Sequence, residues 1–439
     1  MVAAAPFRGL RFDPAVVGDY GAVTAPPYDM IPPDARGDYE ARSPYNVVRL
    51  ILTRGARDDP ARYDHVPRLL GAWRGEGALL LDPAPALYLY EETYLLRGER
   101  RVQRGVLATV TLDDSGTAIL PHERTMAGPV EDRLCLLEAA RANLSPLFGV
   151  YAGGGRAAAV LDGLTIQRPA VACVDEAGVE HRLWPVTDPG RIAAWREQFA
   201  GQQLLIADGH HRYQASLRYR DARRAAEPDR RPAPWDEVLM FLVDADQHGP
   251  SILPVHRLLA DLPASAVVAA LADDFEARES GGVEELEAAL AALPPSAVAF
   301  GLHGGGRSRL LVARDPAAMA AEAGLDRAPL DVEVLHGPVL AKRLGVTDFE
   351  ARVGYEADLA RAVRRVDEIG PASVVVLRAV SFEQVVSIAR GGGTLPQKTT
   401  SFLPKPRDGL VLRPLDPAAA AAAPGARRRP RPSPPQPGA

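Results

Sequence analysis

No run of apolar residues in the sequence reaches the roughly 18 to 20 residues that a membrane-spanning helix needs. The first ten residues are small and apolar, but they include Arg8 and Gly9 and lack the basic start and long apolar stretch of a signal peptide. Cysteine is scarce, and Cys135 and Cys173 alone are not expected to form a disulfide framework. A soluble protein of the reducing cytoplasm is therefore expected.

Three common catalytic and nucleotide-binding signatures are also missing. The sequence has no G-x-x-x-x-G-K-[ST] string of a P-loop, no convincing G-x-G-x-x-G after a strand, and no G-x-S-x-G nucleophile elbow. The glycine runs at 153–155 and 304–306 are predicted to be turns. A P-loop ATPase and a Rossmann dinucleotide site are thus disfavoured. The formal net charge of −5 also disfavours a surface that coats nucleic acid, which is normally basic.

What is present is ordinary globular composition. The 439 residues are 47% apolar and 24% charged, and they suffice for two or three domains. The last stretch, residues 418–439, is rich in Ala, Pro and Arg and has little that could form a core. This tail is predicted to be disordered, either as a solvated segment or as a contact for acidic partners.

Hydrophobic patterning predicts helices and strands in a mixed order. Strands are predicted at 86–96 and 105–112, joined as a hairpin through 97–100, and at 204–207, 237–244, 372–377 and twice within 296–314. Helices are predicted at 131–142, where acidic residues at the start suit the helix dipole, and at 189–200, 264–275 and 282–293. This order indicates an α+β or mixed α/β fold.

The strongest chemical signal is the DGHHR pentad, residues 208–212, which lies between a short apolar strand and a helical pattern. Gly209 allows a sharp turn, and the helix start directs unpaired backbone N–H groups toward an anion. Arg212 can grip phosphate with two donors, and His210 and His211 can donate hydrogen bonds or carry protons. Asp208 could bind Mg²⁺ or orient a histidine. An exposed polar turn is the plainer alternative. Zinc is disfavoured because adjacent histidines seldom face one ligand.

Two further strings carry candidate groups. In PHERT, Glu123 is a candidate general base and His122 a candidate phosphate or substrate contact, although a solvated loop is the simpler alternative. In LPQKTTSF, which Pro404 and Lys405 follow closely, three hydroxyls after a lysine suit an anion or substrate loop. Lys398 and Thr399 are the candidates there, since the lysine offers a point charge for phosphate.

Two positions near the N-terminus are more ambiguous. Residues 25–29 contain two prolines and form a stiff turn that presents Asp29, which is either a functional carboxylate or part of a structural turn. Residues 43–50 place Asn46 and Arg49 beside a predicted apolar strand. Arg49 is either a ligand contact or an ordinary salt-bridge partner.

Taken in order, several strings resemble one family. The strings PPYDMI, SPYNVVRL, PHERT with a following DR–LL, ANLSP, ADGHHRY, ILPVHR and KTTSF–PK resemble the bacterial and archaeal DUF1015 family over roughly residues 6–415. The resemblance predicts a DUF1015-like region at 1–417. It is divided into an α/β part at about 1–150, a central part with the pentad at about 151–260, and a C-terminal α/β part at about 261–417.

The pentad is also similar to the phosphate-binding motif of free-serine kinases built on the ParB/sulfiredoxin fold. This likeness implies a ParB/sulfiredoxin-like catalytic core with additional α/β domains. It implies transfer of a phosphoryl group from pyrophosphate or a nucleotide to the hydroxyl of free L-serine, with Mg²⁺ as cofactor. The net charge disfavours a ParB-like nucleic-acid binder. No cysteine lies beside the pentad, which disfavours a sulfiredoxin. A non-catalytic phosphate- or nucleotide-binding regulator is the other alternative.

On this resemblance, roles can be assigned to the candidate residues. His210, His211 and Arg212 would hold the donor phosphates, and Asp208 would bind Mg²⁺ directly or through water. Asp29 and Glu123 are both candidates for the base that accepts the serine proton. Lys398 and Thr399 would bind the amino-acid carboxylate or the donor.

Overall fold

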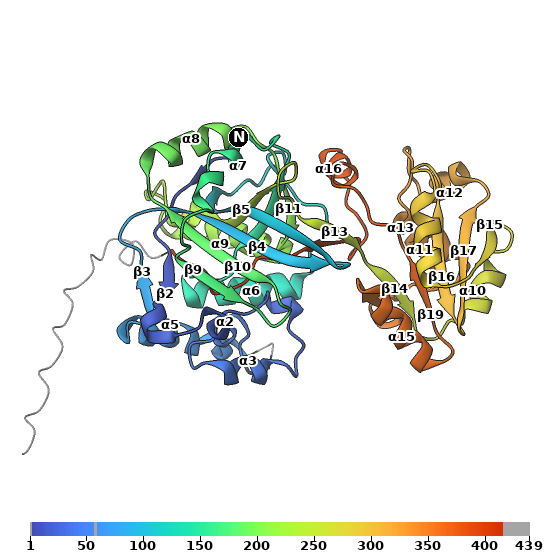
Figure 1. Cartoon of the computed structure of the whole chain (residues 1–439), viewed down its shortest axis with the longest axis horizontal. Coiled ribbons are helices and arrows are strands. Elements are labelled where there is room, and N and C mark those ends of the chain that lie inside the picture. The colour runs from blue at the N-terminus through green and yellow to red at the C-terminus, as the bar shows by residue number, and fades with distance from the viewer. Residues whose placement is uncertain (1, 57–58, 416–439) are drawn as a thin grey trace, which may run out of the picture. The chain divides into compact units, whose positions relative to one another are not determined.

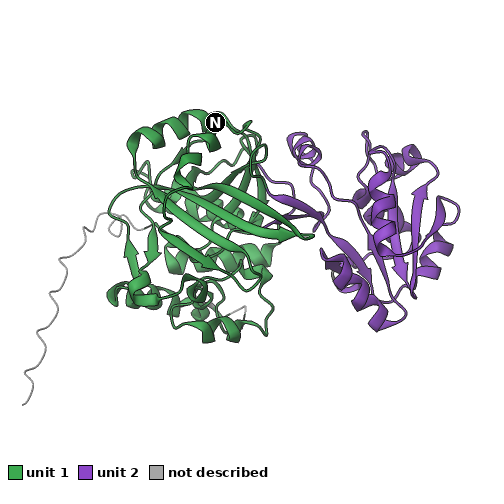
Figure 2. Cartoon of the chain, in the orientation of Figure 1, with its two compact units in different colours: residues 1–119, 125–249, 405–439 green, residues 120–124, 250–404 purple. Residues whose placement is uncertain are grey.

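The computed structural model describes residues 2–56 and 59–415, shown as a cartoon in Figure 1; the tail predicted at 418–439 lies outside them. The described residues form two compact units (Figure 2). Of the described residues, unit 1 draws on 2–56, 59–119, 125–249 and 405–415, and unit 2 on 120–124 and 250–404. The predicted boundary near 260 lies close to the change of unit at Pro250, whereas the one near 150 falls inside unit 1.

Unit 1 is built on a nine-stranded mixed sheet, counted over the described residues. The strand order is β6-β11-β8-β12-β5-β4-β10-β9, with β1 beside β5. The strands are β1 (Ala4–Ala5), β4 (Leu87–Leu96), β5 (Glu99–Thr111), β6 (Ile119–Leu120), β8 (Leu147–Tyr151), β9 (Val171–Val174), β10 (Glu180–Val186), β11 (Leu204–Asp208) and β12 (Glu237–Asp244). Short pairs add β2 (Leu10–Phe12) to β3 (Leu79–Leu81) and β7 (Ala142–Asn143) to β21 (Arg413–Pro414).

The sequence predicted the centre of this sheet well. The predicted hairpin is confirmed: β4 and β5 pair antiparallel from Leu96↔Glu99 onward. The turn is tighter than expected, because Arg97 and Gly98 both take positive φ (52° and 82°), which suits a two-residue turn between twisted strands. Strand β12 pairs with β5 on one side and runs parallel to β8 on the other. All but its first residue are buried, as expected for an apolar run in a sheet covered on both faces.

Helices surround the sheet of unit 1. They are α1 (Pro14–Val17), α2 (Tyr20–Val23), α3 (Arg36–Arg42), α4 (Val48–Ile51), α5 (His65–Gly75), α6 (Ala127–Ala140), α7 (Arg156–Ala159), α8 (Pro189–Phe199) and α9 (His210–Ala226). Short 3-10 helices occupy Tyr28–Met30, Pro60–Tyr63, Asp162–Leu164 and Pro234–Asp236. Trp195 and Phe199 of α8 stack at 4.9 Å in the core, and α6 packs on α9.

Two local predictions in unit 1 were wrong. Residues 43–50 do not lie beside an apolar strand: Arg49 belongs to the short helix α4, whose Val48 and Ile51 are buried. Helix α6 begins at Ala127, four residues before the predicted start, so its acidic residues lie beyond the first turn and the dipole argument fails. The β-branched residues of α4 favour strand locally, but a single buried turn of helix outweighs that preference.

Unit 2 has a six-stranded sheet in the order β15-β17-β16-β19-β14-β18, and a separate pair, β13 with β20. Its strands are β13 (Ser251–Pro254), β14 (His256–Leu259), β15 (Phe275–Ser280), β16 (Ala299–Gly304), β17 (Arg307–Ala313), β18 (Val353–Glu356), β19 (Ser373–Val376) and β20 (Thr400–Leu403). Its helices are α10 (Ala264–Ala270), α11 (Val283–Ala292), α12 (Pro316–Glu322), α13 (Asp331–Val334), a π-helical stretch Leu335–Arg343, α14 (Phe349–Arg352), α15 (Leu359–Ile369) and α16 (Phe382–Arg390). Helix α10 is shorter than predicted, because β15 takes over at Phe275.

After unit 2, the chain returns to unit 1. Leu412 exchanges two main-chain hydrogen bonds with Leu10, and Arg413 of β21 pairs with Asn143. The mixed α+β class predicted from the sequence is confirmed. None of the helices in the described ranges is long and apolar enough to span a bilayer.

Candidate functional site

The DGHHR pentad lies where strand β11 passes into helix α9, as predicted. Asp208 ends β11, which pairs antiparallel with β8 and shifts register between Ile206 and Asp208. Gly209 takes φ of +96° and precedes the first helical residue, His210. No side chain caps the start of α9. The first-turn N–H groups therefore retain the anion affinity expected of a helix N-terminus.

Glycine is required at position 209 for two separate reasons. The positive φ strains any residue with a Cβ, and a Cβ here would lie 2.7 Å from Leu147 Cδ2 and 3.2 Å from Arg212 Nε. Gly209→Ala should lower the free energy of unfolding by about 2–4 kcal/mol, combining backbone strain and crowding. Gly201→Ala is the matched control, because Gly201 has φ of +79° but open space around it. It should cost only about 1 kcal/mol. Equal losses in urea denaturation would rule out the crowding.

Asp208 is the centre of a compact ion-pair cluster in unit 1. One carboxylate oxygen lies 2.6 Å from Arg212 Nη2 and the other 2.5 Å from Lys405 Nζ. The same ammonium lies 3.3 Å from Asp29 Oδ2. Arg212 also donates a 2.5 Å hydrogen bond to the carbonyl oxygen of Pro146. Two carboxylates and two cations, from three separate parts of the chain, thus meet at the start of α9.

Burial and pairing fix the charge of these groups. Burial alone would lower the pKa values of Arg212 and Lys405, but Asp208 and Asp29 raise both, so both side chains stay cationic. Arg212 Nε is buried and has no hydrogen-bond acceptor among the residues that the structure describes. A buried donor without an acceptor costs free energy. A ligand oxygen that accepts a hydrogen bond from this N–H would remove that cost.

The two histidines of the pentad differ in their surroundings. His210 is buried in the first turn of α9. His211 accepts a 3.1 Å hydrogen bond at Nε2 from the backbone N–H of Met126, the residue before α6. In this arrangement Nε2 carries no proton, so any proton on a neutral His211 is at Nδ1.

A third carboxyl group, Asp408, lies in the same electrostatic environment. Its side chain is fully buried and accepts a 2.6 Å hydrogen bond from Ser145 Oγ. Burial raises its pKa to about 7, against the opposing effects of Arg212 and the Ser145 hydrogen bond. Burial thus favours the protonated form of Asp408, and the nearby carboxylates Asp29 and Asp208 act in the same direction.

A small cavity of about 50 Å³ opens beside Arg212. Arg133, Ser145 and Ser216 contribute polar groups to its wall, and leucines, alanines and Val238 supply most of the remainder. The guanidinium of Arg133 lies 4.0 Å from the centre of the Tyr28 ring, in the segment that carries Asp29. Two guanidinium groups beside serine hydroxyls suit a small anion.

The glycine run at 153–155 is a turn, as predicted. Asp244 accepts hydrogen bonds from Gly153 N (3.1 Å) and Gly155 N (2.9 Å), and Asp246 accepts one from Gly154 N. The protein's own carboxylates thus occupy the N–H groups that a phosphate would need. This excludes the loop as a phosphate cradle in the form described.

Other parts of the fold hold the remaining candidate residues. Four of them belong to unit 2. Glu123 forms a β-bridge with Leu395, and His122 Nε2 lies 3.1 Å from Thr400 Oγ1. Lys398 is exposed, and Thr399 Oγ1 donates a 2.5 Å hydrogen bond to the carbonyl oxygen of Pro396. Their proposed catalytic roles stay predictions.

Arg49 lies in unit 1 but is engaged elsewhere. Its Nη2 donates a 2.6 Å hydrogen bond to the carbonyl oxygen of Glu40, and its own carbonyl contacts His65 Nε2 at 3.0 Å. These contacts tie α4 to α3 and α5. A structural role explains them, and the ligand contact proposed for Arg49 stays a prediction.

Two residues of the cluster were not selected from the sequence. Lys405 belongs only to the string that follows KTTSF, and Asp408 belongs to none of the motifs described above. Both lie about 200 positions after the pentad, so no local spacing connects them to it. The sequence does contain one usable signal: Lys405 is one of only three lysines in the chain, with Lys342 and Lys398.

Comparisons with known proteins give a family and several distant structures. Residues 4–334 match the family described as "Protein of unknown function (DUF1015)". A conserved hypothetical protein from Pyrococcus furiosus is 14% identical, with a TM-score of 0.33 over 69% of this chain and 91% of that one. A free serine kinase in complex with AMP is 15% identical, with a TM-score of 0.35 over 68% and 87%.

A third solved structure is SbnI with a C-terminal truncation from Staphylococcus aureus, which is 10% identical with a TM-score of 0.31 over 68% of this chain and 84% of that one. The comparison with curated proteins finds no match. The family assignment therefore rests on the match over residues 4–334, and the ParB/sulfiredoxin-like core stays a prediction.

Proposed function

Because the chain belongs to the DUF1015 family, which is described as having unknown function, we propose its activity from the site itself. We propose a small-molecule kinase that transfers a phosphoryl group from pyrophosphate or a nucleotide to the hydroxyl of free L-serine. The observation that carries the proposal is the cluster of Arg212 and Lys405 around Asp208 at the uncapped start of α9. The choice of serine as acceptor rests on the likeness of the DGHHR pentad to that of free-serine kinases.

The charges of the cluster suit phosphoryl transfer. This reaction requires mainly that the donor phosphates be positioned and their charge neutralised. Arg212 brings a two-pronged cation and a buried Nε–H, Lys405 brings a point charge, and the first turn of α9 brings backbone donors. A bound phosphate would compete with Asp208 and Asp29 for these cations, so the ion pairs hold the cations ready while the donor is absent.

The transfer step needs a group that accepts the hydroxyl proton. The serine oxygen forms a bond to the terminal phosphorus of the donor, the bond from that phosphorus to its bridging oxygen breaks, and phosphate or the shortened nucleotide leaves. We assign the serine proton to Asp29, because Asp29 belongs to the ion-pair cluster and is part exposed. Glu123, in unit 2, is the alternative base.

The donor set suits a magnesium ion that arrives with the donor. Within the described ranges no group of three or more His, Cys, Asp or Glu side chains is placed to hold a metal ion, so an all-protein cage does not fit. Mg²⁺ commonly binds through one or two carboxylates together with substrate phosphates. Asp208 would then be its protein ligand, directly or through water, and Asp29 would keep its role as the base. When bound, the ion would neutralise charge on the donor phosphates.

A donor screen tests the proposal. The protein is incubated with L-serine and Mg²⁺ together with pyrophosphate, ATP or ADP in parallel, and O-phosphoserine is measured by mass spectrometry. We expect phosphoserine with at least one donor, and less of it when Mg²⁺ is omitted. If no donor gives product but pyrophosphate or a nucleotide raises the melting temperature, the protein is a phosphate-binding regulator instead.

A further inference from the structure

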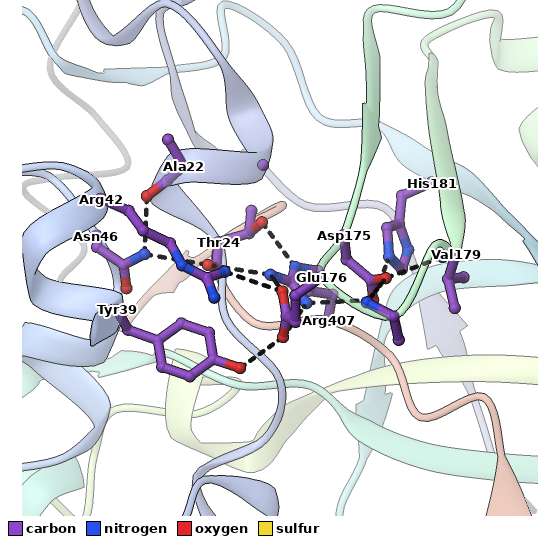
Figure 3. A network of polar contacts seen from close by, with 12 residues as sticks. Ala22, Thr24, Tyr39, Arg42, Asn46, Asp175, Glu176, Val179, His181 and Arg407 are labelled. Carbon is purple, nitrogen blue, oxygen red and sulfur yellow. Dashed lines mark hydrogen bonds and ion pairs between the residues drawn. The ribbon is translucent and has the colours of Figure 1, made fainter. Parts of the chain in front are cut away.

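A second polar network in unit 1 lies next to the cluster in sequence, and it centres on Arg407 (Figure 3). The Arg407 side chain is only 2% exposed. Its Nε donates to Thr24 Oγ1 at 2.8 Å, and its Nη2 donates to Glu176 Oε2 at 2.7 Å. Its Nη1 lies 3.3 Å from Asp175 Oδ2. One guanidinium therefore joins the returning C-terminal segment to the chain after α2 and to the turn between β9 and β10.

The groups that receive Arg407 are themselves fixed. Tyr39 donates to Glu176 Oε1 at 2.5 Å, and Arg42 donates to Oε2 at 3.0 Å. Although burial alone would raise it, hydrogen bonds from Arg407 and Tyr39 lower the pKa of Glu176 to about 2. Asp175 accepts from the backbone N–H of Val179, and its other oxygen lies 3.1 Å from His181 Nε2. Arg407 is thus bound to rigid, ionised anchors (Figure 3).

The same connection continues along the main chain into the cluster. Ala25 N donates to Asp408 O at 3.1 Å, and Asp408 N donates to Ala25 O at 2.8 Å. Asp29 follows Ala25 after two prolines that stiffen the backbone, and Lys405 precedes Arg407 by two residues. The two segments that Arg407 and this bridge tie together therefore carry Asp29 and Lys405, whose charged atoms lie 3.3 Å apart.

We propose that Arg407 is a positioning residue, which fixes residues 405–408 against residues 24–25 and the β9–β10 turn and thereby holds the Lys405 ammonium against Asp208 and Asp29. Lysine needs such support, because its four-carbon stem is flexible and its ammonium is a point charge without fixed direction. A displacement of about 1 Å at a catalytic group can cost about 100-fold in rate. This catalytic consequence rests on the proposed kinase function, whereas the placement of Lys405 does not.

Amine labelling measures the placement of Lys405 without any assay of activity. The chain has only three lysines, and the other two serve as internal references: Lys398 is exposed, and the Lys342 side chain is 56% exposed. An acetylating reagent must reach the amine, and the Lys405 side chain is only 15% exposed and lies against two carboxylates. In the wild-type protein we therefore expect mass spectrometry to show Lys405 acetylated several-fold more slowly than both references.

The variants separate positioning from general stability. Arg407→Met should raise the acetylation rate of Lys405 several-fold while the two references keep their rates, since only Lys405 loses its placement and becomes more accessible. Glu176→Gln, which removes one ionised anchor, should give a smaller increase. Arg42→Met is the matched control, because Arg42 also contacts Glu176 but touches no residue of 405–408 in the contacts described. It should leave the Lys405 rate unchanged.

Circular dichroism first establishes that each variant is folded, and Arg407→Lys replaces Arg407→Met if the latter is not. Wild-type rates at Lys405 in folded variants of both Arg407 and Glu176 would overturn the proposal, as would rapid labelling of Lys405 in the wild type. A slow wild-type rate that rises in the variants supports it, even if the donor screen yields no phosphoserine; in that case only the kinase function fails.

Discussion

Replacing Arg212 with alanine is expected to lower kcat/KM for phosphoserine formation by at least about 10³-fold, the scale of an arginine that neutralises a transferring phosphoryl group. The side chain is only 11% exposed, pairs with Asp208 at 2.6 Å and provides an Nε–H without an acceptor among the described residues. Steady-state kinetics with the donor identified in the screen measures the loss. Calorimetric titration with pyrophosphate measures the accompanying loss of donor affinity.

Two further variants make this result specific. Arg212→Lys keeps the positive charge but loses the fork of donors, so its activity should lie between those of the wild type and Arg212→Ala. Arg218→Ala removes another arginine of α9, whose side chain is 51% exposed and pairs with Glu131 on the surface. It should change kcat/KM by less than about twofold. Near-normal turnover in a folded Arg212→Ala protein would remove the pentad from the mechanism.

Replacing Glu92 with glutamine is expected to stabilise the protein in alkaline solution. Glu92 is fully buried in unit 1, where Gln103 Nε2 lies 2.5 Å from one oxygen and the Tyr90 hydroxyl 2.9 Å from the other. Burial raises its pKa to about 8, despite these hydrogen bonds. The folded protein therefore keeps a proton on Glu92 that the unfolded chain releases near its ordinary pKa of 4.5.

The direction with pH follows from this difference. Below about pH 4.5 both states hold the proton, and Glu92 makes no pH-dependent contribution to the free energy of unfolding. As the pH rises from about 4.5 toward 8, Glu92 loses its proton in the unfolded state but keeps it in the folded state. The free energy of unfolding therefore falls over this range, and it stops falling above about pH 8, where Glu92 is ionised in both states. The gain from Glu92→Gln should therefore grow between about pH 5 and about pH 8.5, by up to an order of 4 kcal/mol.

Urea denaturation at both ends of that range measures the effect. Glu99→Gln is the matched control, because Glu99 begins the neighbouring strand β5 and its side chain is 69% exposed. Its effect on stability should be small at either pH. A pH-independent difference between Glu92→Gln and the wild type would show that Glu92 is ionised in the folded protein.

The parts of the fold that the sequence predicted are those governed by local patterns. Strands β4 and β12 were predicted to within one residue, because continuous apolar runs determine them locally. Strand β5 begins six residues before its predicted start, because the polar residues at its beginning show no apolar pattern. The strand-to-helix junction at Asp208 and Gly209 was found for the same reason as β4 and β12. Helix α4 was not, because one turn of helix is too short to show a 3.6-residue period.

The candidate site was predicted only where it is continuous in sequence. Arg212 and Asp208 are four residues apart in one motif, so spacing alone placed them together. Lys405 and Asp408 reach the same place through long-range pairing, Ala25 with Asp408 and Leu10 with Leu412, which no periodicity predicts. Asp29 was selected as a candidate, but its contact with Lys405 links residues 376 positions apart.

Because the segment from Lys405 to Leu415 returns to unit 1 after unit 2, the order of synthesis matters. During translation, the pentad is synthesised first, residues 250–404 of unit 2 follow, and Lys405, which pairs with Asp208, is added only after them. Until then, Leu10 and strand β7 lack the strand residues that pair with them, Leu412 and β21. The ion pair of Arg212 with Asp208 likewise lacks the ammonium group of Lys405. The ion-pair cluster around Asp208 is therefore among the last features of unit 1 to be completed, and a chain that ends before Lys405 cannot form it.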